Sequence, residues 1–171
     1  MKAALELFSE HGVSATSLQM IANALGVTKA AVYHQFNTKD EIVLAVTEAE
    51  MLKIEAALDA AEAQQDSLRA REMLLVWVID LAIQRRRLVS VLQFDPVIIR
   101  LLASHEPFVA VITRLYSVLI GDDTGPESLV QAAMLSATIG GTVANPLVDG
   151  LDERTLRDQL IFLTRRIVGI A

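Results

Sequence analysis

Residues 16–36 read TSLQMIANALGVTKAAVYHQF, and this stretch decides how the amino-terminal part of the chain folds. Thr16 and Gln19 have the spacing of a capping box, in which two side chains satisfy each other's free amides at a helix start. Gly26 is placed to end that helix, because glycine adopts the left-handed conformation without strain. A second short helix is predicted directly after it, over 28–36. Two short helices joined by a tight glycine turn predict a helix-turn-helix. The residues expected to face inward on the first helix are Leu18, Ile21, Ala22 and Leu25.

The helix over 28–36 divides into two faces, because successive side chains are about 100° apart. Thr28, Val32 and Phe36 share the side that would pack on the preceding helices. The opposite side carries Ala30, Tyr33, His34 and Asn37, with Lys29 beside it. A small alanine among hydrogen-bonding side chains suits a helix that enters the major groove of DNA. On spacing alone the alternative stays open, since any unit of three packed helices has a similar pattern.

The neighbouring segments complete a three-helix unit. Residues 1–11 carry an apolar helical stripe, and Gly12 is placed to end that helix. Thr38 and Glu41 have the spacing of a second capping box, which predicts a long helix reaching the mid-60s. Lys39 lies in its first turn, where free amides and the helix dipole attract anions, so we expect Lys39 to hold a DNA phosphate.

The rest of the chain predicts further helices and no strand of useful length. Asp66 and Ser67 can cap a helix that contains the apolar run 73–83, and Pro96 and Pro107 suit helix starts. Residues 121–125 form the clearest loop. Helices are expected over 126–145 and from about 152 to 169, with a break near Pro146. The fold class is therefore all-α.

Composition limits the possible functions. The chain has no cysteine, which excludes disulfides, thiolate metal sites and a cysteine nucleophile. Acidic residues in the first apolar segment argue against a secretory leader, and the polar residues within 129–148 favour a buried helix over a membrane span. We therefore expect a cytoplasmic protein. No arrangement of catalytic or metal-binding side chains is recognisable, so we expect neither an enzyme nor a metal or cofactor site. A net charge of −6 argues against a nucleic-acid partner, and residues 1–47 hold three lysines against four carboxylates.

The amino-terminal residues resemble the TetR family of transcriptional regulators. The resemblance covers about residues 3–45 and rests on the segments 4–12 (ALELFSEHG), 15–17 (ATS), 20–22 (MIA), 25–36 (LGVTKAAVYHQF) and 39–42 (KDEI). It implies a helix-turn-helix DNA-binding domain over 1–46 and a larger helical domain over 47–171 for ligand binding and dimerisation. It also implies a repressor that binds double-stranded operator DNA as a homodimer and is released by a small-molecule effector.

The resemblance also assigns residues to DNA contact. Matched by position, the contacts are Thr16, Ser17, Thr28, Lys29, Ala30, Tyr33, His34 and Lys39. Two features depart from the family pattern. Ala30 stands where the family often has glycine, which alters base preference. Only Lys2 precedes the first helix, where the family usually has several basic residues, so either the native start lies upstream or the basic arm is missing.

Two sets of residues are candidates for the carboxy-terminal functions. Small side chains at helical spacing, followed by a leucine stripe, resemble the two helices that each subunit contributes to a four-helix interface; an intramolecular core is the alternative. The interface candidates are Ala133, Ser136, Ala137, Gly140, Leu156, Leu160, Leu163 and Ile167. Bulky residues of the middle helices are candidates for a ligand pocket, although each is more often plain core. They are Met73, Trp77, Asp80, Leu81, Phe94, Phe108 and Tyr116. Asp80 is more simply explained as a solvated residue.

A second function remains possible at this stage. The acidic balance is compatible with a helical dimer that binds a small molecule or a protein and has lost DNA binding. The set Lys29, Tyr33, His34 and Lys39 argues against this alternative. DNA binding that weakens steeply with salt would separate the two hypotheses.

Overall fold

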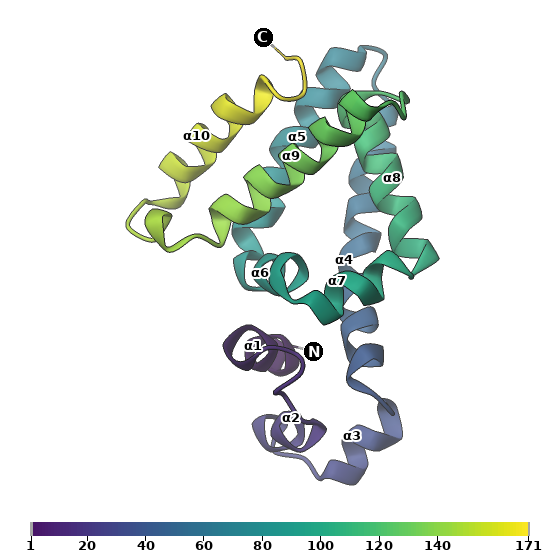
Figure 1. The fold of residues 1–171 in the computed structure, drawn as a ribbon, viewed down its shortest axis with the longest axis vertical. Helices are drawn as coiled ribbons and strands as arrows, with labels where there is room; N and C mark the ends of the chain where they lie inside the picture. The colour runs from purple at the N-terminus through teal and green to yellow at the C-terminus, as the bar shows by residue number, and fades with distance from the viewer. Residues whose placement is uncertain (1, 171) are drawn as a thin grey trace.

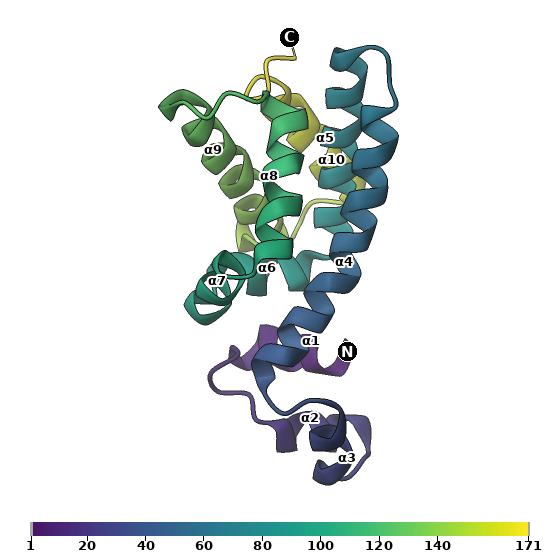
Figure 2. The same cartoon turned by 90° about the vertical axis from the view of Figure 1, so that its right-hand side faces the viewer.

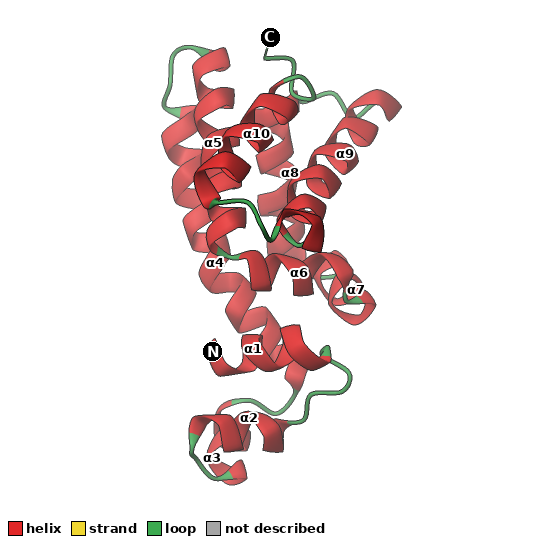
Figure 3. Cartoon of the chain, turned by 90° about the vertical axis from the view of Figure 1, so that its left-hand side faces the viewer, coloured by secondary structure: helices red, strands yellow, loops and turns green. Residues whose placement is uncertain are grey.

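The computed structural model describes residues 2–170, and every regular element within that range is a helix (Figure 3). The predicted all-α class is confirmed. The helices are α1 (Lys2–His11), α2 (Leu18–Leu25), α3 (Lys29–Gln35), α4 (Lys39–Glu62), α5 (Ser67–Gln84), α6 (Arg86–Phe94), α7 (Pro96–Ala103), α8 (Glu106–Ile120), α9 (Pro126–Val143) and α10 (Glu153–Arg165), with a short 3₁₀ turn at Pro146–Val148.

Helix ends follow the local chemistry of the sequence, with two corrections. The predicted capping box of Thr16 and Gln19 is wrong: Ser17 is the N-cap of α2, and its hydroxyl accepts a hydrogen bond from the Met20 amide at 3.1 Å. Thr38 caps α4 as predicted, but Glu41 accepts from the amide of Asn37 rather than that of Thr38. Side-chain caps of this kind satisfy amides that have no partner inside the helix.

The molecule consists of two parts joined by a long helix. Figure 1 shows α1, α2 and α3 together at one end and the remaining helices above them. In Figure 2, α4 runs from the small unit into the large one without a break. We call α1–α3 with the start of α4 the helix-turn-helix module, and the rest of the chain the body. The predicted boundary at residues 46 and 47 falls inside α4, so this division stays a prediction about function.

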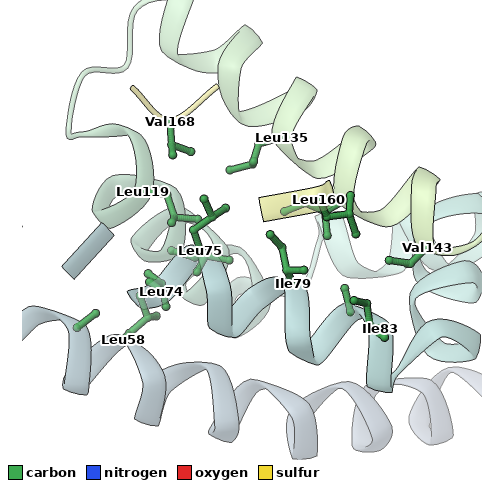
Figure 4. Packing of buried hydrophobic residues seen from close by; sticks show 14 of the residues in the cluster. Leu58, Leu74, Leu75, Ile79, Ile83, Leu119, Leu135, Val143, Leu160 and Val168 are labelled. Carbon is green, nitrogen blue, oxygen red and sulfur yellow. The ribbon is translucent and has the colours of Figure 1, made fainter. Parts of the chain in front are cut away.

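Each part has its own hydrophobic core. The core of the body combines side chains of α4, α5, α8, α9 and α10, and Figure 4 shows Leu75 and Ile79 of α5 among them. The core of the module centres on Phe8, Ile21 and Val32. It also includes residues from α6 and α7 of the body, so the module is attached by packing as well as by α4.

Burial corrects one prediction for α2. Leu18, Ile21 and Ala22 are buried as expected, but Leu25 is 48% exposed. Leu25 is the last residue of the helix, and the chain turns away at Gly26 with a φ of 66° before any neighbour covers it. Within residues 2–170, no single helix has the length and apolar character needed to cross a membrane. Together α7 and α8 meet those criteria, but they are bent by 87° at their junction.

Candidate nucleic-acid interface

Helix α3 lies at the far end of the module (Figure 1). Val32 is buried and Phe36 packs on the module core, as the two-face division predicts, but Thr28 is exposed because it is the N-cap at the start of the helix. Lys29, Tyr33 and His34 are exposed, and the Lys29 Nζ atom lies 5.4 Å from the centre of the Tyr33 ring. A cation over an aromatic face is held there by the ring quadrupole. This contact aligns the two side chains on the same exposed surface.

The start of α3 is fixed by its own N-cap. The Thr28 hydroxyl accepts a hydrogen bond from the Ala31 amide at 3.2 Å. Ala30 is exposed within the first turn and adds no bulk to that surface. A helix can therefore approach another molecule closely at this point.

The net charge of −6 argued against DNA binding, but the acidic residues are not distributed evenly along the chain. No carboxylate occurs between Glu10 and Asp40, so α2, the turn and α3 carry none. Lys29 is the formal positive charge on α3, and neither α2 nor the turn adds a negative one. Glu6 of α1 forms an ion pair with Arg87 of α6, with 3.5 Å between Nη1 and Oε1. The acidic balance of the chain therefore lies outside the surface that α2 and α3 present.

The structure separates the two residues predicted at the start of α2. Ser17 is exposed. Thr16 is only 1% exposed, and its hydroxyl donates to the carbonyl oxygens of Gly12, at 2.8 Å, and Leu7, at 3.2 Å. The assignment of the Thr16 side chain to phosphate contact is therefore corrected: its hydroxyl ties the α1–α2 loop to α1.

Lys39 also makes bonds inside the protein. Its Nζ atom donates to the carbonyl oxygens of Val13, at 2.6 Å, and Ser14, at 3.0 Å. The ammonium group carries three donors, so a third remains for another acceptor. In this structure the positive charge of Lys39 lies between the start of α4 and the α1–α2 loop.

Sequence reasoning missed a polar pair on α2. Gln19 and Asn23 are both exposed, and the Gln19 amide nitrogen donates to the Asn23 oxygen at 2.8 Å. They lie four residues apart, so they share one face of the helix. The apolar residues Leu18, Ile21 and Ala22, which the sequence places on the inward side, were the signal that could have identified this face.

The interface candidates divide between the surface and the core. Leu156 and Leu160 are each 2% exposed and belong to the core of the body, and Gly140 is buried against Gln93. These three assignments are corrected to the intramolecular alternative, because neighbours in the same chain already cover them. Ser136 is half-buried and accepts hydrogen bonds from Gln93, and Ile167 packs on the core. Ala133, Ala137 and Leu163 are exposed.

Other apolar side chains lie open on the same two helices. Helix α9 exposes Val130 and Met134, and α10 exposes Phe162 next to Leu163. Val130, Ala133, Met134 and Ala137 repeat at intervals of three and four residues, so they form one stripe along α9. In Figure 1, α9 and α10 run side by side on one face of the body. Exposed apolar side chains at helical spacing are candidates for contact with another surface.

The seven pocket candidates do not surround one hollow. A cavity of about 560 Å³ lies between the end of α8, the following loop and α9, and only Tyr116 of the predicted set lines it. Burial raises the pKa of the Tyr116 phenol, and a hydrogen bond with Ser136 opposes this effect. Trp77 and Phe108 pack on the body core. The remaining candidates are elsewhere: Met73 and Phe94 are exposed, and Leu81 is half-buried on α5.

Asp80 has a partner of its own. Its carboxylate forms an ion pair with the Arg157 guanidinium, with 3.2 Å between Oδ2 and Nη2, and this pair joins α5 to α10. The carboxylate raises the pKa of Arg157 above its ordinary value. Asp80 is therefore paired and does not line the cavity beside Tyr116.

Comparison with known proteins identifies the module. Residues 1–46 match the family profile described as "Bacterial regulatory proteins, tetR family". The HTH-type transcriptional regulator AcrR of Shigella flexneri is 36% identical over 98 residues, which cover 55% of this chain and 46% of AcrR. The match thus spans less than half the length of that relative. The HTH-type transcriptional regulator SrpR of Pseudomonas putida is 52% identical over 44 residues, covering 26% of this chain and 21% of SrpR.

Solved structures of similar shape cover almost the whole chain. A bacterial regulatory protein in the tetR family from Rhodococcus RHA1 has a TM-score of 0.71 and 21% identity, and the alignment covers 99% of this chain and 95% of that one. FadR of Bacillus subtilis, solved in complex with stearoyl-CoA, has a TM-score of 0.64 and 18% identity over 99% and 94% of the two chains. At these identities the likeness concerns the fold.

The fold and the exposed residues define a helix-turn-helix protein in which α3 is exposed and a further helical body follows the module. Residues 1–46, which contain this helix-turn-helix, match the profile of the tetR family of bacterial regulatory proteins. The resemblance noted in the sequence is confirmed.

Proposed function

We propose that this chain is a transcriptional repressor that binds operator DNA as a homodimer and releases it when a small molecule binds the body. The observation that carries the proposal is the exposed face of α3. Lys29, Tyr33 and His34 lie on it, and no carboxylate occurs between Glu10 and Asp40. Lysine favours phosphate contact, and the mixed donors and acceptors of the other side chains suit base edges.

Contacts at the rim of α3 would set its position on the duplex. The exposed hydroxyl of Ser17 and the free donor of Lys39 are the proposed phosphate contacts. Thr28 occupies the N-cap of α3 and is exposed beside Lys29. Contacts of this kind fix register, whereas the outward residues of α3 would read the sequence. Gln19 and Asn23 extend the proposed surface along α2.

The proposed subunit interface is the exposed face of α9 and α10. Its members are Val130, Ala133, Met134, Ala137, Phe162 and Leu163. Two such helices from each subunit would form a four-helix bundle around a twofold axis. A dimer of this kind places two recognition helices on one duplex, and it requires two half-sites spaced by whole turns of DNA.

The cavity between α8 and α9 is the proposed effector site. Its volume of about 560 Å³ lies within the size range of ligand pockets, and its lining combines apolar side chains such as Ile120 and Leu129 with polar groups that include Arg114 and Tyr116. A protein of the same fold holds stearoyl-CoA, which supports a small-molecule effector as a class. A ligand bound there touches both α8 and α9, and α9 belongs to the proposed interface.

A fluorescence-anisotropy titration against genomic duplex fragments tests the DNA-binding proposal. The variant is Lys29→Ala with Tyr33→Ala, because both side chains are exposed and bond to no other part of the protein. The matched control is Lys53→Ala, which removes an exposed lysine of α4 whose partner is Glu50. Binding is measured at two salt concentrations, since each lost phosphate contact lowers the salt slope by about one.

Loss of saturable binding in the α3 variant, with the Lys53→Ala control unaffected, is the expected result. No binding by the full-length wild type at low salt would refute the repressor proposal. A helical dimer that binds small molecules would then be the leading function.

A further inference from the structure

The end of α6 contacts two parts of the molecule that the proposed function needs to connect. Gln93 lies in the last turn of α6, and Asp95 follows it as the N-cap of α7. Only two residues apart, Gln93 bonds to α9 and Asp95 bonds to the helix-turn-helix module. Helix α6 also packs directly on α1.

Asp95 uses its two carboxylate oxygens for different purposes. Oδ1 accepts from the amides of Val97, at 2.9 Å, and Ile98, at 3.4 Å, and thereby caps α7. Oδ2 accepts from the Val13 amide at 2.9 Å, across 82 positions of sequence. Burial of the carboxyl opposes ionisation, yet these three hydrogen bonds and the charge of Arg100 hold its pKa below the ordinary value. The charged form therefore links the body to the α1–α2 loop.

The same loop is held from the other side by Lys39. The Val13 amide donates to Asp95 while the Val13 carbonyl accepts from the Lys39 ammonium at 2.6 Å. Gly12, immediately before Val13, has a φ of 77°, a backbone conformation that favours glycine. The loop thus has one fixed path between α4 and α6, and α2 begins only a few residues further along.

Gln93 fits into α9 at a glycine. Its Nε2 atom donates to the carbonyl oxygen of Ser136 at 3.0 Å and to the Ser136 hydroxyl at 3.1 Å. A Cβ atom on Gly140 would lie 2.3 Å from the amide carbon and nitrogen of Gln93. The side chain of Gln93 therefore occupies the space that the absent side chain of Gly140 leaves on α9.

Packing around the junction leaves little room for independent movement. The cavity between α1, α4, α6 and α7 measures only about 10 Å³. Val91 of α6 and Ile98 of α7 are buried in the module core beside Phe8 and Val43. These contacts tie the position of α6 to that of the module.

We infer that residues 93–95 form a coupling element that transmits the position of α9 to the helix-turn-helix module, with Gln93 as the contact on α9 and Asp95 as the contact on the module. The inference rests on the proposed function, in which α9 belongs to the subunit interface and α3 binds DNA. Asp95 and Gln93 are positioning residues that touch neither DNA nor effector.

Asp95→Asn isolates the contact with the module. The asparagine oxygen retains the cap on α7, but its amide group presents a donor where the Val13 amide needs an acceptor. Asp66→Asn is the matched control, since Asp66 caps α5 through Oδ1 with the same two distances, 2.9 Å to Leu68 and 3.4 Å to Arg69, and has no bond to the module. Hydrogen exchange of the Val13 amide, followed by NMR, reads the bond directly. We expect exchange about tenfold faster or more in Asp95→Asn and unchanged in Asp66→Asn.

A second readout follows the position of the module. The chain has no cysteine, so Gln35→Cys on exposed α3 introduces one spin label per subunit. We expect a broader distribution of distances between the two labels in Asp95→Asn, together with operator binding weakened about 3- to 30-fold. Gly140→Ala, which displaces Gln93, should broaden the distribution without changing Val13 exchange. If Gly140→Ala does not fold, Gln93→Met is used in its place, because it removes the hydrogen bonds to Ser136.

The two measurements test different parts of the inference. Equal Val13 exchange in Asp95→Asn and Asp66→Asn would overturn the role of Asp95. Unbroadened distances in both Asp95→Asn and the α9-side variant would overturn coupling. Absence of any dipolar signal between labels in the wild type would refute the proposed dimer, and the link to α9 with it, while Val13 exchange would still decide the contact made by Asp95.

Discussion

Replacing Leu163 by glutamine should weaken the proposed dimer and leave the folded subunit almost unchanged. Complete burial of a leucine side chain contributes about 1.5–3 kcal/mol. Leu163 is 53% exposed in the single chain, so about half of that contribution, ~0.8 to 1.5 kcal/mol, remains for an interface to provide. A twofold interface contains the residue twice, which doubles the loss to about 1.5–3 kcal/mol per dimer. The dissociation constant of the dimer should then rise about 10- to 150-fold.

Leu68→Gln is the matched control. Leu68 is 54% exposed, almost the same fraction as Leu163, but lies at the start of α5 and outside the proposed interface. Sedimentation equilibrium over a dilution series measures the dissociation constant, and circular dichroism confirms that both variants remain helical. If Leu163→Gln dimerises as tightly as Leu68→Gln, then α10 does not form the interface and the assignment is refuted.

Three further predictions concern single residues of the module and its junction with the body. Thr16→Val should lower the free energy of unfolding by about 1 kcal/mol, because the hydrogen bonds from the hydroxyl to the carbonyls of Gly12 and Leu7 are lost, and Thr16→Ser should restore it. Urea denaturation measures both variants, and a DNA-binding defect without loss of stability would contradict the structural role. Gly26→Ala should cost about 1 kcal/mol, since alanine at a φ of 66° is strained, and thermal unfolding checks this against Ala24→Gly. The pKa of Asp95 is lower in the folded protein than its ordinary value of 3.8. The ionised carboxylate therefore stabilises the folded state fully above pH 3.8, and this stabilisation is lost as the pH falls through the folded-state pKa. Urea denaturation from pH 3 to pH 6 should therefore give a shallower loss of stability below about pH 4 in Asp95→Asn than in the wild type, and parallel curves would contradict the linkage.

Local chemistry made the helix boundaries of this protein readable from sequence. Thr38 and Asp66 cap α4 and α5 as their side chains predict, and Gly26 ends α2 in the left-handed conformation. Each of these features depends on a side chain and amides within a few residues of it. The exposed face of α3 followed in the same way, because Val32 and Tyr33 point in different directions on any helix. Fold class and the candidate DNA surface were therefore accessible before the structure.

Which residues of α10 are buried could not be predicted from the sequence, because it depends on the helices that pack against α10. The leucines at 156, 160 and 163 form one sequence stripe, yet the buried row runs at four-residue intervals through Leu156, Leu160 and Thr164. Leu163 falls at the edge of that row and is left exposed. Periodicity gives the direction of a side chain but not which helix covers it, so core and interface could not be separated from the sequence.

The sequence alone thus determined what neighbouring residues decide: the all-helical class, the caps at Thr38 and Asp66, and the polar face of α3. Tertiary structure alone decided the contacts between distant residues. Thr16 looked like a phosphate ligand but its hydroxyl binds a carbonyl of the α1–α2 loop, and Lys39 bonds to the same loop. Asp80 pairs with Arg157. The bond from Val13 to Asp95 spans 82 positions and has no local signature. Such contacts depend on how whole helices pack, because a side chain can bind only what the fold brings within about 3 Å of it.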